Sequence, residues 1–215
     1  MKTLFVLCSS LIVNKPIFKK HKIGLQYGKS RLDQYENGFK ILLDKNIYNN
    51  FDKTLLVDNT LDSEVNIPVN IRSLLIDEME YFLFKENKLG VLNKGAGVLD
   101  SLIRVKDFMK HYDYVIYFEP KLWVSNTMFF ETIKEMPRNL FYEVEEYPQV
   151  KSGHFCSNTQ DLVDFIESVD ISLMIRNKIN LENLIFDFYK NRNSEFIKGS
   201  FTKRYDPYND RMIDY

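Results

Sequence analysis

The 215-residue chain is long enough for one ordinary domain but too short for two full hydrophobic cores. Hydrophobic residues make up 45% of it and charged residues 27%, a composition that excludes disordered, collagen-like and disulfide-scaffold proteins. With 29 Lys and Arg against 30 Asp and Glu, the chain lacks the basic excess of a nucleic-acid binder, so we expect no nucleic-acid partner.

The two cysteines and the apolar beginning of the chain bear on its compartment. Cys8 and Cys156 are too few for a disulfide framework and lack metal-ligand spacing, which indicates a reduced, cytoplasmic environment. The apolar run over residues 4–13 is too short to span a bilayer and lacks the features of a signal peptide. We interpret it as a buried β-strand.

Strands and helices are expected to alternate through the first half. The β-forming runs predict strands over residues 3–7, 54–57, 90–92 and 114–118. Apolar residues at helical spacing predict a helix after Ser30, a second over residues 71–84 and a third from about Leu99 to Met109. Residues 15–29 are polar and predict a loop. Nearly continuous apolar strands alternating with helices are typical of a parallel sheet covered on both faces, so we expect a Rossmann-like α/β fold.

The second half is more mixed. Alternation over residues 139–147 predicts a strand, and helices are expected to begin at Asn158 or Thr159 and at Asn180. From Asn191 onward the polar and aromatic sequence predicts a tail that is ordered or partly mobile. No segment resembles a linker, so we expect residues 1–215 to form a single domain with a mixed C-terminal part.

Polar residues follow each expected strand of the first half. In an open α/β sheet, ligands bind beyond the carboxyl ends of the strands, and these residues would suit a sugar and phosphate ligand. The alternative is that such turns are polar because they face water. The residues concerned are Ser9 and Ser10, Asp58 and Asn59, Asn93, Lys94 and Gly95, and Glu119 and Lys121.

Three of these segments have specific chemistry. In residues 93–97, the glycines and the following helix N-terminus favour an anion, with Lys94 adding a positive charge, although a plain strand-to-helix turn fits as well. Glu119 alone makes an incomplete site for Mn²⁺ or Mg²⁺, which favours metal independence and predicts no metal ligands. His154, beside Gly153, is expected in a turn, either near a phosphate or at the edge of the core.

Four stretches in this order resemble the GT-A-type glycosyltransferases. They are residues 31–34 (RLDQ), 55–59 (LLVDN), 93–97 (NKGAG) and 113–119 (DYVIYFE), with a looser similarity at residues 180–182 (NLE). The resemblance covers about the first 125 residues. It implies that residues 1–125 form a nucleotide-binding half and residues 126–215 an acceptor-side half with a C-terminal tail.

The resemblance implies transfer of a sugar from a nucleotide-sugar donor to a saccharide or lipid-linked saccharide, in surface polysaccharide or lipopolysaccharide synthesis. The protein would be cytoplasmic, with peripheral association at the inner face of the membrane. Asp58 would bind the base or ribose, and the turn at Asn93 would lie beside the nucleotide. The donor site would also include Ser9, Ser10, Arg31 and Asn59.

One departure from the family concerns its Asp-x-Asp metal motif, because this chain has Glu119-Pro120-Lys121 at the corresponding place. The positive charge that the leaving diphosphate needs would then come from protein cations. Those available are Lys94, Lys121, His154 and Arg204. Glu119 or Glu182 would deprotonate the acceptor in an inverting enzyme.

Two other functions stay open. A sugar nucleotidyltransferase would need a glycine-rich basic loop after the first strand, which Ser9-Ser10-Leu11 does not provide. A non-enzymatic Rossmann-like module would bind a partner through its aromatic tail, which contains Phe201, Tyr205, Tyr208 and Tyr215.

Overall fold

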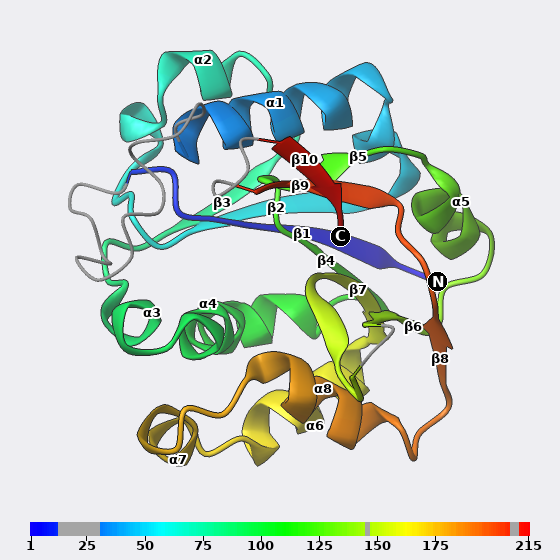
Figure 1. Ribbon diagram of the computed structural model, residues 1–215. Helices are drawn as coiled ribbons and strands as arrows, with labels where there is room; N and C mark the ends of the chain where they lie inside the picture. Colours follow the sequence, from blue (N-terminus) through cyan, green and yellow to red (C-terminus); the bar gives the residue numbers. More distant parts are fainter. Residues whose placement is uncertain (13–30, 145–146, 207–210) are drawn as a thin grey trace.

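The computed structural model describes residues 1–12, 31–144, 147–206 and 211–215. Within these residues, seven strands form a central sheet and three form a small second sheet (Figure 1). The strands are β1 (Thr3–Ser9), β2 (Lys53–Asp58), β3 (Glu80–Leu83), β4 (Tyr114–Phe118), β5 (Trp123–Val124), β6 (Asn139–Glu143), β7 (Val150–Asn158), β8 (Ser194–Ile197), β9 (Thr202–Asp206) and β10 (Arg211–Asp214). The α-helices are α1 (Arg31–Asp44), α2 (Val69–Arg72), α3 (Lys88–Leu92), α4 (Lys94–Met109), α5 (Met128–Glu135), α6 (Thr159–Ser168), α7 (Ile171–Arg176) and α8 (Leu181–Tyr189).

The central sheet has the order β3-β2-β1-β4-β7-β6-β8. Strands β3, β2, β1 and β4 run parallel, β7 is antiparallel to both of its neighbours, and β8 is parallel to β6. The predicted mostly parallel α/β sheet with a mixed C-terminal part is therefore confirmed. Because β1, β2 and β4 share one direction, their carboxyl ends meet at the same edge of the sheet.

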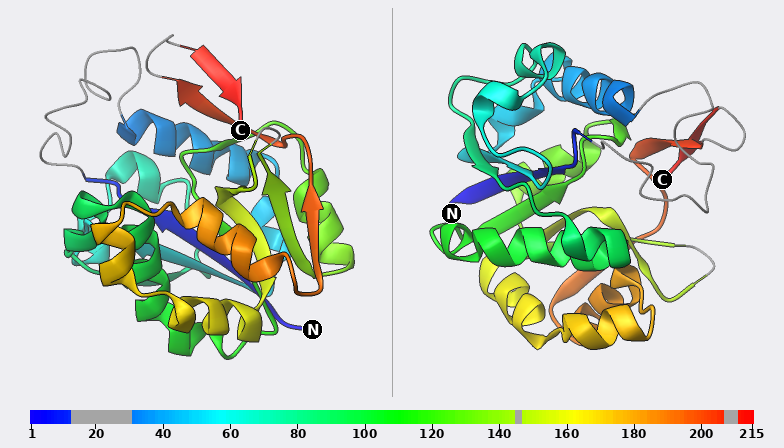
Figure 2. Two further views of the ribbon diagram at one scale, coloured as in Figure 1. Left: turned by 60° about the horizontal axis from the view of Figure 1, so that its bottom comes forward. Right: turned by 90° about the vertical axis from the view of Figure 1, so that its left-hand side faces the viewer.

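Apolar cores cover both faces of the sheet. Side chains alternate along each strand, so Phe5 and Leu7 enter one core while Leu4 and Val6 enter the other. Helices α1 and α2 lie on one side with the small sheet, and α4, α6 and α8 lie on the other, as Figure 1 and the right-hand view of Figure 2 show. This double coverage explains why β1 is buried along its whole length.

Two predicted elements were wrong. Residues 71–84 do not form one helix: α2 ends at Arg72, and the end of the segment is β3, which pairs in parallel with β2. Residues 90–92 are not a strand but part of α3, and a β-carbon on Gly97 of α4 would lie 2.6 Å from the Gly90 α-carbon. Tertiary contacts outweighed the local sequence pattern in both segments. Residues 80–83 pair with the edge of β2, and residues 90–92 pack closely against α4 as part of a helix.

The C-terminal tail, to which the sequence analysis assigned no strand, contains β8, β9 and β10. Strand β8 extends the central sheet beside β6, while β9 pairs with β5 and β10 to form the small sheet. The predicted strand over residues 139–147 ends at Glu143 in the structure. The loop expected at residues 15–29 and the cap expected at Ser30 lie outside the described residues.

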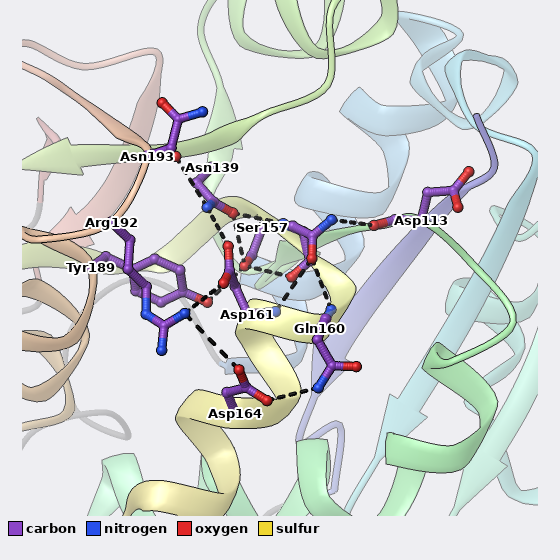
Figure 3. Close-up of polar contacts among 10 residues, drawn as sticks. Asp113, Asn139, Ser157, Gln160, Asp161, Asp164, Tyr189, Arg192 and Asn193 are labelled. Carbon is purple, nitrogen blue, oxygen red and sulfur yellow. Dashed lines mark hydrogen bonds and ion pairs between the residues drawn. The ribbon is translucent and has the colours of Figure 1, made fainter.

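A polar network lies at the amino-terminal edge of β4, beside Tyr114, which pairs with Asn158 (Figure 3). The Asn158 side chain accepts hydrogen bonds from the backbone N–H groups of Gln160 and Asp161 and so caps α6. Arg192 donates to Asp161 at 2.7 Å. These contacts anchor α6 at the edge of the sheet opposite to the carboxyl ends of β1, β2 and β4.

Candidate functional site

A pocket lies at the carboxyl ends of β1, β2 and β4, between α1 and α4. Seven residues that the sequence singled out line it: Ser9, Ser10, Arg31, Asn59, Lys94, Glu119 and Lys121. They come from segments far apart in the chain, and the parallel arrangement of the strands brings them together.

Asp58 lies beneath the pocket and does not line it. Its side chain is 0% exposed, and both carboxylate oxygens accept hydrogen bonds from the surrounding loops. The Ser9 hydroxyl donates to Oδ2 at 2.6 Å and the Leu11 N–H at 2.9 Å, while the N–H groups of Thr60 and Leu61 donate to Oδ1 at 2.7 and 3.1 Å. Asp58 therefore ties the loop after β1 to the loop after β2. Its expected contact with a base or ribose stays a prediction.

The next residue, Asn59, faces the pocket. The Ser10 hydroxyl donates to its Oδ1 at 2.6 Å, and the Ser10 N–H donates to the Tyr35 hydroxyl at 3.1 Å. These bonds fix the wall of the pocket formed by β1, β2 and α1. Their remaining polar capacity suits the hydroxyl and carbonyl groups of a nucleoside.

Glu119 is the central negative charge of the pocket. It is 8% exposed, forms an ion pair with Lys121, and accepts a 3.4 Å hydrogen bond from the Tyr117 hydroxyl. Burial alone would raise the pKa of Glu119, but the charges of Lys121, Lys94 and Arg31 lower this pKa to about 2. Glu119 is therefore ionised at neutral pH.

Lys94 stands at the start of α4 on the exposed side of the pocket. Repulsion by Lys121 is the largest influence on the pKa of Lys94, and desolvation and Arg31 act in the same direction. The charges of Glu119 and Glu182 oppose them, and the net result is a pKa of about 8 for Lys94. Part of the Lys94 population therefore loses its proton in mildly alkaline solution.

Arg31 contributes the third positive charge. Its interaction with Tyr35 is the largest of several that raise the pKa of the guanidinium group. Its Nε atom is buried and has no hydrogen-bond partner among the described residues. Because a buried guanidinium N–H normally finds an acceptor, this atom is suited to an anionic ligand in the pocket.

The floor of the pocket includes Cys8 and Tyr117. Burial raises the pKa of the Cys8 thiol, with a further contribution from Glu119, so the thiol stays protonated. Cys156 is buried as well, and both cysteines are free. Cys8 is accordingly an uncharged part of the wall, and nothing in its surroundings activates it as a nucleophile.

Other predicted site residues lie outside the pocket lining. Asn93 caps α4 by accepting the Ala96 N–H at 3.1 Å, and its Nδ2 donates to the Ile179 carbonyl at 3.2 Å. A β-carbon on Gly95 would lie 2.6 Å from the Leu181 β-carbon, so this glycine permits close packing of α4 against α8. Both residues therefore support the start of α4.

His154 lies in β7 and not in a turn. It is 0% exposed, and the rings of Phe129, Tyr142 and Phe201 surround it. Burial lowers the pKa of His154 to about 3, so the ring is neutral at physiological pH. Gly153 concealed this location in the sequence, because glycine often marks a turn, whereas here it allows Leu122 and Tyr215 to approach the strand.

Glu182, in the first turn of α8, is half-buried next to the pocket. Its Oε1 accepts a hydrogen bond from the Ser152 hydroxyl at 2.7 Å, and its charge acts on Lys94. Arg204 is exposed and lies over the Tyr215 ring, 5.0 Å from its centroid.

Sequence reasoning missed part of the pocket wall. Asn87, Gly90 and Ser101 line it from α4 and from the segment that contains α3, and Tyr35 and Tyr117 line it from α1 and β4, whereas Gly97 belongs to the segment over residues 93–97 that the sequence singled out. The helical spacing from Lys94 to Gly97 and Ser101 was the available signal. No such signal pointed to Asn87, which precedes α3, because the sequence predicted a strand and not a helix at residues 90–92.

Two absences among the described residues concern metal ions and membranes. No three His, Cys, Asp or Glu side chains in residues 1–12, 31–144, 147–206 and 211–215 are grouped as a metal site would require. No helix within the same ranges is both long and apolar enough to cross a membrane.

Comparison with solved structures defines the fold. A protein from Desulfovibrio desulfuricans G20, provisionally described as a nucleotide-diphospho-sugar transferase, aligns with 92% of this chain and 80% of its own at 8% identity and a TM-score of 0.57. S. aureus TarS aligns with 94% of this chain at 13% identity and a TM-score of 0.51, and the alignment covers 36% of the TarS chain.

A third structure, 4-diphosphocytidyl-2C-methyl-D-erythritol synthase from Anaerococcus prevotii, aligns with 99% of this chain and 90% of its own, at 9% identity and a TM-score of 0.51. No protein-family model and no curated protein matches the sequence. The chain thus has the GT-A-like fold of nucleotide-diphospho-sugar transferases, as the resemblance in its sequence predicted.

Proposed function

We propose that this protein is a glycosyltransferase that binds a nucleotide-diphospho-sugar in the pocket and transfers the sugar to a hydroxyl group of a glycan acceptor. The observation that carries the proposal is the placement of Arg31, Lys94 and Lys121 together at the carboxyl ends of the parallel strands. Three cations around one pocket suit a diphosphate, and Ser10 and Asn59 offer polar groups to the nucleoside.

In the proposed reaction, the bond between the anomeric carbon and the diphosphate oxygen breaks as a bond to the acceptor oxygen forms. The nucleoside diphosphate leaves with the bonding electrons, and the cations stabilise its added negative charge. The acceptor hydroxyl loses its proton to a base. Glu119, with a pKa of about 2, accepts protons poorly, so we assign this role to Glu182.

The acceptor is a saccharide or a lipid-linked saccharide, and we place the reaction in surface polysaccharide or lipopolysaccharide synthesis in the cytoplasm, with peripheral association at the membrane. In support, the structurally similar protein from D. desulfuricans is described as a transferase of nucleotide-diphospho-sugars. Residues 1–125 then provide the donor half and residues 126–215 the acceptor half.

The test is incubation of the purified protein with UDP-, GDP-, CMP- and dTDP-sugars, with detection of the released nucleotide. Each donor is supplied with a mixture of saccharide acceptors, and again without any acceptor. We expect one donor to be consumed faster when an acceptor is present. Absence of nucleotide release from every donor would contradict the proposal.

A sugar nucleotidyltransferase is the second candidate. The similarity to the A. prevotii synthase, which extends over 90% of that chain, favours it. In that reaction a sugar-phosphate oxygen attacks the α-phosphorus of a nucleoside triphosphate, and pyrophosphate leaves. Release of pyrophosphate from a nucleoside triphosphate and a sugar phosphate, without turnover of any nucleotide-sugar, would favour this candidate over the first.

The third candidate, a module that binds a partner through its aromatic tail, loses support. Phe201 is buried and stacks on Phe129 at 4.5 Å between ring centroids, and the Tyr215 ring lies 5.9 Å from that of His154. These two rings contribute to packing inside the protein. The structure describes no side chain for Tyr205, and Tyr208 lies outside the described residues.

A further inference from the structure

The charge balance of the pocket differs from that of a metal-dependent site. Among the described residues that line it, Arg31, Lys94 and Lys121 are positive and Glu119 alone is negative. The described lining therefore carries two more positive than negative charges, and Glu182 beside the pocket and Asp58 beneath it offset only part of this excess. Such a pocket attracts an anion and repels a cation.

Glu119 is also poorly placed to hold a metal ion. It already forms an ion pair with Lys121 and accepts a hydrogen bond from Tyr117. A divalent ion such as Mg²⁺ or Mn²⁺ takes several oxygen ligands and is usually anchored by more than one carboxylate. The residues present in the pocket do not fit such an ion.

Arg31 provides the observation that points to an anion. Arg31 lines the pocket, its Nε atom is buried, and no described residue accepts a hydrogen bond from that atom. Arginine presents its N–H groups in a planar fork that matches two oxygens of a phosphate. A phosphate oxygen of a ligand can therefore accept the hydrogen bond that the Nε–H group of Arg31 does not make within the described residues.

We infer that this pocket binds the diphosphate of its ligand through Arg31, Lys94 and Lys121, and that it does so without a divalent metal ion. The inference rests on the proposed function for the identity of the ligand. It assigns to protein cations the neutralising role that a metal ion has in metal-dependent members of the family that the sequence resembles. Glu119 acts as a positioning residue, because its charge holds Lys121 at the pocket before the ligand binds.

The test uses the unmodified protein and inorganic pyrophosphate, with binding measured by calorimetry. We expect saturable binding in the presence of a chelator. Added Mg²⁺ should weaken the apparent affinity, because Mg²⁺ complexes free pyrophosphate in solution. A metal-dependent site shows the opposite sign. Binding that occurs only with Mg²⁺ or Mn²⁺, or no binding under either condition, would overturn the inference.

Variants locate the binding site. We expect Arg31→Gln to raise the Kd for pyrophosphate about tenfold, because it removes a charge-assisted hydrogen bond. Lys106→Gln is the matched control, since Lys106 lies on α4 in an exposed ion pair with Glu167 and its replacement changes the net charge equally. An equal loss of affinity in both variants would indicate a general charge effect and would contradict the assignment.

Lys121→Gln would leave Glu119 as a buried charge without its partner, and so it is combined with Glu119→Gln to keep the charge of the pair unchanged. We expect the double variant to fold and to bind pyrophosphate at least about fivefold more weakly, because the ammonium group of Lys121 is lost from the anion site. Unchanged affinity would exclude Lys121 from the anion site.

The same experiments separate this inference from the proposed function. If pyrophosphate binds without metal but no nucleotide-sugar is consumed, the anion site stands and the transferase proposal fails. If a nucleotide-sugar is consumed only with Mn²⁺ and pyrophosphate also requires the metal, the transferase proposal stands and this inference fails.

Discussion

Gly38 of α1 and Pro120 meet through their backbones: a β-carbon on Gly38 would lie 1.5 Å from the Pro120 carbonyl oxygen. Pro120 connects the two charged residues of the pocket, Glu119 and Lys121. The absence of a side chain at Gly38 therefore allows α1 to support the segment that carries this ion pair.

Gly38→Ala should destabilise the protein and disturb the pocket together. Overpacking costs about 1–3 kcal/mol, and the better helix propensity of alanine offsets about 1 kcal/mol of it. We expect a net loss of up to about 2 kcal/mol in the free energy of unfolding, measured by urea denaturation. Lys40→Ala, at an exposed position of the same helix, should change it by less than about 0.5 kcal/mol. Equal stability of the two variants would contradict the packing role of Gly38.

Asp58→Asn should act on stability more than on nucleotide affinity. The carboxylate now accepts hydrogen bonds from N–H and O–H groups, whereas the NH₂ group of asparagine would face these donors and could not accept from them. We expect a loss of about 2–4 kcal/mol in the free energy of unfolding. Asn59→Ala, one residue further, should cost only about 1 kcal/mol but weaken nucleotide binding. If Asp58→Asn kept full stability and lost nucleotide affinity, Asp58 would have the direct role that the family resemblance implied.

His154 should make stability fall as the pH falls. Its pKa lies at about 3 in the folded protein, below its usual value of 6.5, so the unfolded chain takes up the proton first. Stability from this residue is complete above pH 6.5 and is lost progressively toward pH 3. We expect a decrease of about 2 kcal/mol between about pH 7.5 and pH 5, measured by urea denaturation at each pH.

The variant His154→Leu should lack this decrease, whereas His111→Gln, at an exposed histidine, should retain it. Glu119 does not obscure the result. The folded-state pKa of Glu119 is about 2, below its usual value of 4.5. Its contribution to stability is therefore lost mainly between pH 4.5 and about pH 2, below the pH range of this experiment. A slope unchanged by His154→Leu would show that another group is responsible.

Pyrophosphate binding should weaken as the pH rises through about 8, where Lys94 loses its proton. Lys94→Arg keeps its charge across this range, so its affinity should decline less between about pH 7 and pH 9.5 than that of the unmodified protein. Calorimetric titration at several pH values measures the difference. Identical pH profiles would remove Lys94 from the anion site.

Glu182→Gln should lower kcat for sugar transfer about 100-fold while leaving the Kd for the nucleoside diphosphate within about twofold, because a general base acts on the acceptor and not on the donor. Glu135→Gln, at an exposed position of α5, is the matched control and should change neither quantity. A rise in Kd with unchanged kcat would assign Glu182 to binding instead.

The sequence predicted four of the seven described strands of the central sheet, β1, β2, β4 and β6, and about half of the pocket wall, for reasons that particular residues make clear. The strands at residues 3–7 and 114–118 are apolar throughout, so they could only be buried, and the polar residues after them had to meet at one edge. The β8 to β10 region was missed because its strands are short and partly exposed. Strand β8 pairs with β6, and β9 pairs with β5, in each case more than 50 residues away, which no local pattern records.

The position of Phe201 has a consequence for synthesis of the chain. This ring seals the space between Phe129 and His154, and it is translated long after both of them. While the nascent protein is being made, the central strands can already pair, but the imidazole of His154 is still accessible to water and can take up a proton. Folding during synthesis should therefore proceed in two stages. The central strands pair first, and water is excluded from the cluster of Phe129, His154 and Phe201 later.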